Sequence, residues 1–226
     1  MLRAIIFDCD GVIADTEPLH FAAFQRVLEE EGILLTREQY YRDYLALDDR
    51  NCFTQVHQDR AVALSPETLS DLIARKAGYI EPMMLSHLLI FPGVVEFMRQ
   101  ASERYPMAVA SGALRHEVEL VLKHAGVREL FQAIVAAEDV INGKPHPEPF
   151  LKACSLLNAG RKDPIGAHEC LVIEDSIPGV RAAHTAGMRC LAVTNSYSRD
   201  RLDGADRIVA GLDEASIEDL EGLFQG

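Results

Sequence analysis

Four short segments of the chain carry polar side chains that together could transfer a phosphoryl group. They supply four carboxylates, a hydroxyl and an ammonium group, on Asp8, Asp10, Ser111, Lys144, Glu174 and Asp175. Carboxylates can hold Mg²⁺, a hard cation that prefers oxygen ligands. The cation would offset the repulsion between a carboxylate nucleophile and an anionic phosphate, while the hydroxyl and the ammonium hold phosphate oxygens. This combination indicates phosphoryl transfer.

The first segment offers a nucleophile and a proton donor two residues apart. The Asp8 carboxylate could attack phosphorus and form an aspartyl phosphate. Asp10 could protonate the leaving oxygen and later activate water, and Gly11 would let the backbone approach the phosphate closely. Each segment alone has a plainer interpretation as a solvated turn, a loop lysine or a helix cap. Their conjunction favours the chemical one.

The predicted secondary structure brings these segments to one edge of a sheet. Short apolar runs predict strands at 4–7, 107–110, 133–136, 170–173, 189–193 and 207–209. Helical stretches of about ten residues between them imply right-handed crossovers and a parallel sheet. Ligands of open parallel sheets bind outside the carboxyl ends of the strands. The four segments follow such strand ends, so we expect them to meet there.

A helical block interrupts this alternation after the first strand. Within it, Ser65 and Pro66 are typical of a helix start, with Ser65 as N-cap. We therefore predict an α/β protein with a doubly wound parallel sheet. Its phosphotransfer core domain comprises residues 1–14 and 89–226, and a helical cap domain comprises residues 15–88. The hinges should lie where the two domains join.

Composition excludes several classes of partner. The 226 residues are 48% hydrophobic, enough for a sizeable core, and 35 Asp and Glu against 22 Lys and Arg give a net charge of −13. Such a chain suits neither nucleic acid nor an anionic membrane, and no apolar run approaches the roughly 20 residues of a membrane span. The five cysteines are widely spaced without a CxxC motif. They predict reduced thiols, no zinc site and a cytoplasmic location.

The motifs FDCDG, ASG, GKPHPEP and VIEDS, in this order, resemble the haloacid dehalogenase (HAD) superfamily. The similarity is greatest to its β-phosphoglucomutase-like, or CbbY-like, phosphatase subgroup, and it runs through the whole core. It implies a Rossmann-like HAD core with a small helical cap. It also implies a set of site residues: Asp8 as nucleophile, Asp10 as general acid and base, Ser111, Gly112 and Lys144 as phosphate ligands, and Mg²⁺ held by Asp8, the Asp10 backbone carbonyl and Asp175, with Glu174 at or near the metal. The dehalogenase branch has no acid at the position that corresponds to Asp10, because displacing halide needs no proton donor. The presence of Asp10 therefore favours phosphate chemistry.

Four cap residues fall where the sugar-phosphate mutases of this subgroup have a hinge pair and distal cationic contacts: Thr16, His20, Arg50 and Lys76. Two departures argue against mutase activity. Leu47 replaces the glycine that those mutases carry three residues before the arginine, and the segment after Ser111 reads GALRH rather than SASK. His20 could orient the general acid or lie on a helix surface. Arg50 and Lys76 could contact substrate or be solvated surface charges.

These features predict a Mg²⁺-dependent phosphatase, monomeric, that hydrolyses a small phosphorylated metabolite, first of all a sugar phosphate, through an aspartyl phosphate. The alternative enzyme is a β-phosphoglucomutase-type phosphomutase, in which the cap excludes water and the phosphoryl group passes to a sugar hydroxyl. Two non-enzymatic alternatives fit less well. A phospho-receiver domain is about half this length and has its acceptor on a later strand, and a degenerate binding protein would have lost a motif position.

Overall fold

The computed structural model describes residues 1–225, which fold as two compact units. One unit, the core unit, contains Met1–Asp15 and the chain from Leu89 onward; the other, the helical unit, is Thr16–Leu88. The chain therefore leaves the core unit after its first strand and returns to it 73 residues later.

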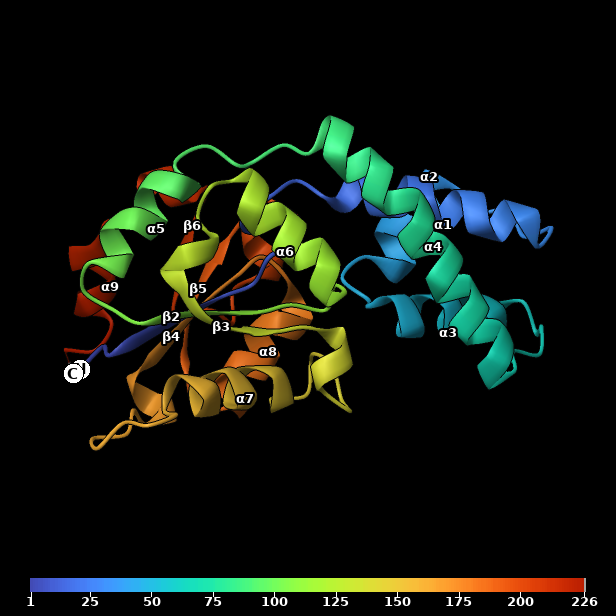
Figure 1. Cartoon of the computed structure of the whole chain (residues 1–226). Helices are drawn as coiled ribbons and strands as arrows, with labels where there is room; N and C mark the ends of the chain where they lie inside the picture. Colours follow the sequence, from blue (N-terminus) through green and yellow to red (C-terminus); the bar gives the residue numbers. More distant parts are fainter. Residues whose placement is uncertain (226) are drawn as a thin grey trace. The chain divides into compact units, whose positions relative to one another are not determined.

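The core unit is built on a six-stranded sheet in which all neighbouring strands are parallel (Figure 1). The strand order is β3-β2-β1-β4-β5-β6. The strands are β1 Ala4–Phe7, β2 Met107–Ala110, β3 Phe131–Val135, β4 Cys170–Glu174, β5 Arg189–Val193 and β6 Arg207–Val209. Since the order reverses at β1, this is the predicted doubly wound parallel sheet.

Two strands differ from their predicted ranges of 133–136 and 170–173, because β3 is shifted and β4 continues by one residue to Glu174. β3 begins earlier, at Phe131, and ends at Val135. The exposed Gln132 interrupts the apolar run, so the sequence pattern showed only the continuous part. Phe131 is buried and pairs with Met107 next to a register shift between β2 and β3.

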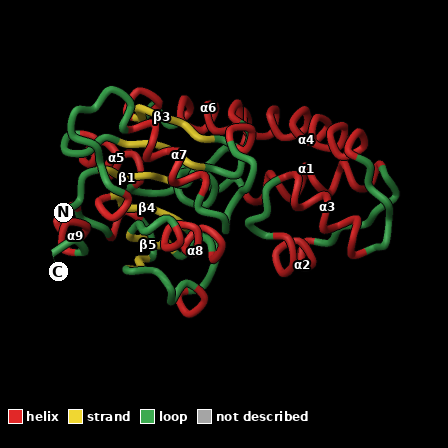
Figure 2. Tube along the Cα trace, turned by 90° about the horizontal axis from the view of Figure 1, so that it is seen from below, coloured by secondary structure: helices red, strands yellow, loops and turns green. Residues whose placement is uncertain are grey.

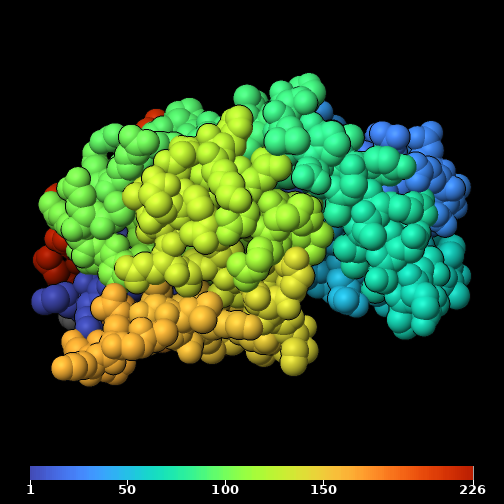
Figure 3. Space-filling model, viewed as in Figure 1, coloured from blue at the N-terminus to red at the C-terminus, as the bar shows by residue number. Residues whose placement is uncertain are grey.

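Helices cover both faces of the sheet, which explains why β1 and β2 are buried throughout. They are α5 Val94–Ser102, α6 Arg115–His124, α7 Glu148–Leu157, α8 Ile177–Thr185 and α9 Ile217–Gly222. Figure 2 shows α7 and α8 across one face of the strands, where they pack on β1–β3 and on β4 and β5. In the space-filling view, atoms of α5, α6 and α7 lie at the surface of this unit and hide the strands (Figure 3).

The two faces of the sheet are packed differently. Toward α7, small side chains such as Ala108 and Ala110 face Phe150 and Ala153 in one apolar cluster. On the other face, the ring of Phe7 packs edge-on against Phe97 of α5 and Phe131 of β3, with ring centroids 6.2 and 5.7 Å away. Burial on both sides holds β1 rigidly, and β1 ends at the first acidic segment.

The helical unit consists of α1 Glu17–Glu30, α2 Arg37–Gln39, a π-helical turn at Tyr40–Tyr44, α3 Asp49–Asp59 and α4 Pro66–His87. Its own apolar cluster is centred on Phe24, Phe53 and Leu72. The predicted start of α4 is confirmed, because the Ser65 hydroxyl accepts a hydrogen bond from the backbone N–H of Thr68 at 3.1 Å. Among residues 1–225, no helix is both long and apolar enough to cross a bilayer.

Candidate active site

The acidic segments lie side by side at the carboxyl ends of neighbouring strands in the core unit. Register pairs Phe7 with Ile173, so Asp8 and Glu174 follow in adjacent strands. The backbone N–H of Asp8 donates to the Ile173 carbonyl at 2.9 Å, continuing the ladder by one residue. Ser111 directly follows β2, the neighbour of β1 on the other side. The parallel sheet thus gathers side chains that are far apart in sequence.

Lys144 connects two of these segments. Its Nζ atom lies 2.8 Å from Asp8 Oδ1 and 2.5 Å from Glu174 Oε1. Burial opposes the charge of this lysine, but the two carboxylates outweigh burial and raise its pKa. The loop that carries it is tied down by Glu148, the first residue of α7, whose carboxylate accepts from the backbone N–H of Ile141 at 2.8 Å. The two carboxylates therefore favour the charged form of Lys144 beside Asp8.

Glu174 is fully buried and uses both carboxylate oxygens. Oε1 binds Lys144, and Oε2 accepts from the N–H of Asp175, the N–H of Ser176 and the hydroxyl of Ser176 at 2.8–2.9 Å. Gly179 makes room for it, because a Cβ there would lie 1.9 Å from Glu174 atoms. The observed contacts make Glu174 the anchor of the lysine and of the turn into α8.

Asp8, Glu174 and Asp175 form a buried acidic cluster, with one oxygen from each within 4.8 Å of the others. Burial raises the pKa of Asp8 to about 7; Lys144 opposes this, and the charges of Glu174 and Asp10 add to it. Burial, together with the charges of Glu174 and Asp8, also raises the pKa of Asp175. Hard oxygen donors whose mutual repulsion a cation would relieve fit a divalent metal such as Mg²⁺.

Asn195 and Ser196, which follow β5 and belong to none of the four motifs, support this cluster. The Ser196 hydroxyl donates to Asp175 Oδ2, and Asn195 Nδ2 donates to the Gly11 carbonyl at 2.7 Å. Gly11 itself has a φ of +73°, and a Cβ there would lie 1.9 Å from Asp175 Oδ2. The available signal was their place at the carboxyl end of strand 189–193, the edge where the other segments converge.

Ser111 lies beside the second acid of the first segment. Its hydroxyl donates to Asp10 Oδ2 at 3.1 Å and accepts from the backbone N–H of Ala113 at 3.0 Å. Ser111 is buried, whereas the adjacent Gly112 is exposed. The Ser111 hydroxyl therefore lies next to Asp10, and the exposed Gly112 follows it in the chain.

The cap candidates lie in the helical unit and divide into two kinds. Thr16 and His20 are buried in or next to α1, and Lys76 of α4 is fully buried. Lys76 Nζ lies 2.8 Å from His20 Nδ1 and 2.7 Å from Asp49 Oδ1. The interpretation of Lys76 as a solvated charge and of His20 as a surface histidine is therefore wrong. Arg50 is exposed at the start of α3.

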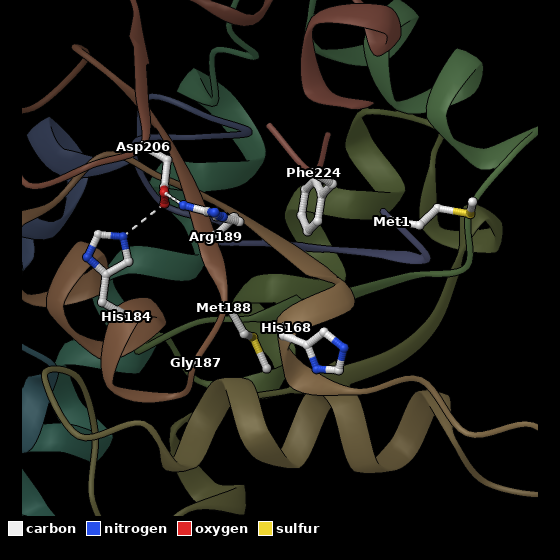
Figure 4. A pocket seen from close by; sticks show the side chains of 8 residues that line it. All are labelled: Met1, His168, His184, Gly187, Met188, Arg189, Asp206 and Phe224. Atoms are coloured by element: carbon white, nitrogen blue, oxygen red, sulfur yellow. Dashed lines mark hydrogen bonds and ion pairs between the residues drawn. The ribbon is translucent and has the colours of Figure 1, made fainter. Parts of the chain in front are cut away.

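A separate cavity of about 580 Å³ (Figure 4) lies at the amino ends of the strands, whereas the acidic cluster lies at their carboxyl ends. Its lining residues are Met1, His168, His184, Gly187, Met188, Arg189, Asp206 and Phe224. Asp206 accepts hydrogen bonds from Arg189 at 2.5 Å and from the His184 ring at 2.9 Å, drawn as dashed lines in Figure 4. The cavity is lined by none of the predicted site residues, so it is distinct from the acidic cluster.

Comparison with known proteins agrees with this arrangement. The family model described as haloacid dehalogenase-like hydrolase matches residues 5–193. The phosphorylated carbohydrates phosphatase of Thermotoga maritima is 30% identical over 93% of this chain and 92% of its own.

Two solved structures share the fold. CbbY of Rhodobacter sphaeroides, crystallised in complex with phosphate, superposes with a TM-score of 0.86 at 26% identity over 98% of this chain and 100% of that one. β-Phosphoglucomutase of Clostridium difficile gives a TM-score of 0.88 at 24% identity over 99% of this chain and 97% of its own. With the family model spanning the sheet from β1 to β5, this chain belongs to the haloacid dehalogenase-like hydrolases.

Proposed function

We propose that this hydrolase is a Mg²⁺-dependent phosphatase of small phosphorylated metabolites, with sugar phosphates as the first candidates. The observation that carries the proposal is the Asp8 carboxylate at the end of β1, 2.8 Å from Lys144 and within the acidic cluster. A charged lysine keeps a buried carboxylate available as nucleophile and can also bind an anionic substrate. The relative from Thermotoga maritima, named as a phosphatase of phosphorylated carbohydrates, supports the substrate class.

The chemistry would proceed in two steps on Asp8. In the first, an Asp8 oxygen attacks phosphorus and the bond to the leaving oxygen breaks, while Asp10 gives that oxygen its proton. In the second, Asp10 takes a proton from water, the water oxygen attacks the aspartyl phosphate, and the bond between phosphorus and Asp8 breaks. Ser111, the exposed backbone at Gly112 and Lys144 would hold the phosphate oxygens during both steps.

Asp8, the backbone carbonyl of Asp10 and Asp175 would hold Mg²⁺, with Glu174 beside it. The ion would supply positive charge that lets the Asp8 anion approach an anionic phosphate. Ser196 would fix the orientation of Asp175, since its hydroxyl already binds one carboxylate oxygen. Gly11 would keep the backbone clear of that carboxylate.

The helical unit would be the cap domain, which was predicted for residues 15–88. In this proposal, Thr16 belongs to the hinge, and the exposed Arg50 is the cap cation available to a substrate. Lys76 would act with His20, which it contacts, rather than as an independent surface charge. Cap opening and closing would admit the substrate and limit the access of water. The expectations of a monomer and of a cytoplasmic location stay predictions.

Phosphomutase activity is the second candidate, because two of the residues singled out by the mutase resemblance, His20 and Lys76, are in contact and buried. Leu47 and the GALRH segment favour the phosphatase. The two are separated by incubating the protein with Mg²⁺ and a panel of sugar phosphates and nucleotides, with a catalytic bisphosphate present. Free phosphate should form faster than any isomeric sugar phosphate. An isomer formed faster than phosphate would reverse the order of the two candidates.

A further inference from the structure

Two of the five cysteines lie with their sulfur atoms in contact in the core unit. Cys154 is in α7 and Cys170 is the first residue of β4, and their Sγ atoms are 3.7 Å apart. Both are free thiols, with Cys154 6% and Cys170 0% exposed. No other contact between two cysteine sulfurs occurs in the part of the chain that the structure describes. Neither residue has a part in the proposed phosphatase reaction.

The two thiols are not equivalent. The side-chain N–H of Asn158 approaches the Cys154 sulfur at 3.7 Å, and the Cys154 thiol can itself donate to the Ile165 carbonyl at 3.6 Å. The Cys170 thiol can donate to the Cys154 sulfur at 3.7 Å or to the Gly166 carbonyl at 3.5 Å. The Asn158 N–H stabilises the thiolate form of Cys154, and when the Cys170 thiol donates to Cys154 its hydrogen bond lowers the pKa of Cys154 to about 7. Donating that hydrogen bond raises the pKa of Cys170. Cys154 is therefore the more reactive thiol, with Cys170 beside it.

We propose that Cys154 and Cys170 form a redox-sensitive pair that closes to an intramolecular disulfide when the protein meets a two-electron oxidant such as hydrogen peroxide. The Cys154 thiolate attacks one peroxide oxygen, the O–O bond breaks, and a sulfenic acid forms with release of hydroxide, which becomes water by taking up a proton. The Cys170 sulfur then attacks the Cys154 sulfur, the S–O bond breaks, and a second water leaves. In total, two thiols lose two electrons and two protons, and one peroxide is reduced to two waters.

The position of the pair gives the bond a defined structural consequence. α7 directly follows the loop that carries Lys144, and its Glu148 holds the backbone of that loop. β4 ends at Glu174, the ion-pair partner of Lys144. The disulfide would link these two elements covalently, at the end of each that is remote from the ion pair. It would leave the carboxylates themselves unchanged.

The test is a peptide map of the full-length protein after treatment with hydrogen peroxide and alkylation of the remaining thiols. The expected result is a linked peptide pair joining Cys154 to Cys170, two hydrogen masses lighter than the reduced pair and released by dithiothreitol. Cys190→Ser is the matched control, since Cys190 is equally buried in the same unit and should leave the linkage unchanged. In Cys170→Ser, oxidation should stop at a Cys154 sulfenic acid that a dimedone probe labels.

Three results would overturn the proposal. They are an absence of linked peptide in the oxidised wild-type protein, a linkage to any other cysteine, or dimedone labelling of Cys154 that is equal in the wild type and in Cys170→Ser. The map of the wild-type protein needs no variant, so it decides the question even if Cys170→Ser does not fold.

Discussion

The stability of the metal-free protein should depend on pH through Asp8, and the variant Asp8→Asn should remove that dependence. Burial raises the pKa of Asp8 from 3.8 to about 7 in the folded protein, with Lys144 opposing the shift and Glu174 and Asp10 adding to it. A carboxyl group whose pKa is raised on folding binds its proton more tightly in the folded state. Its contribution to stability is therefore fully present below pH 4 and is lost as the pH rises through 7.

The size of the effect follows from the shift. Between pH 5 and pH 8, the change in protonation of Asp8 lowers the free energy of unfolding of the wild type by about 3 kcal/mol relative to Asp8→Asn. Asp8 is 7% exposed, so solvent screening takes little from this value. Asn keeps the shape of the side chain and has no charge to bury. The comparison thus measures the titration of Asp8 together with its effect on Asp175, whose pKa the Asp8 charge raises.

The assay is equilibrium unfolding by urea in EDTA at pH 5, 6, 7 and 8, for the wild type, Asp8→Asn and the exposed-site control Asp203→Asn. As the pH rises, the free energy of unfolding of Asp8→Asn should increase steadily relative to that of the wild type. The free energy of unfolding of Asp203→Asn should follow that of the wild type. Mg²⁺ should restore more stability to the wild type at pH 8 than at pH 5, because it offsets the charge that costs most there. A difference that stays constant from pH 5 to pH 8 would refute the reasoning.

Three substitutions test other parts of the site. Ser196→Ala should weaken Mg²⁺ binding about tenfold in isothermal titration, because the hydrogen bond that orients Asp175 is lost. The control variant Ser198→Ala should bind Mg²⁺ like the wild type. Equal Mg²⁺ affinities of the two variants would show that Ser196 does not support the metal site. Gly11→Ala should lower the free energy of unfolding by at least about 2 kcal/mol more than Gly32→Ala, since both have a φ of +73° but only Gly11 lacks space for a Cβ; equal losses in urea would contradict the crowding. Lys144→Met should reduce turnover of the best phosphate ester by about 10²-fold or more, and an unchanged rate would show that the lysine does not serve the reaction.

The sheet could be predicted because its determinants are local. Strands such as Met107–Ala110 and Arg189–Val193 are short apolar runs between helical stretches, and β-α alternation permits essentially one handedness of crossover. β3 was misplaced because Gln132, the second residue of an otherwise buried strand, is exposed. A one-residue exception of this kind depends on the surrounding tertiary structure, which local pattern does not contain.

The site was partly predictable for a related reason. Strand ends identified Asp8, Ser111 and Glu174, since parallel strands place their carboxyl ends together. The hydrogen bond from Ser196 to Asp175 could not be foreseen, because it depends on the path of the loop after β5. The burial of Lys76 was hidden as well: a lysine in a helix is usually solvated, and its partner Asp49 lies 27 residues away in sequence.

The most direct test of the account is phosphate release from sugar phosphates by the wild type and by Asp8→Asn, each with Mg²⁺ and with EDTA. Phosphate should be released by the wild type with Mg²⁺, and EDTA or the substitution should each abolish release. The same samples should show a circular dichroism spectrum typical of the folded protein, so that lost activity reflects lost chemistry. Full turnover by a clean preparation of Asp8→Asn would contradict the assignment of Asp8 as the nucleophile.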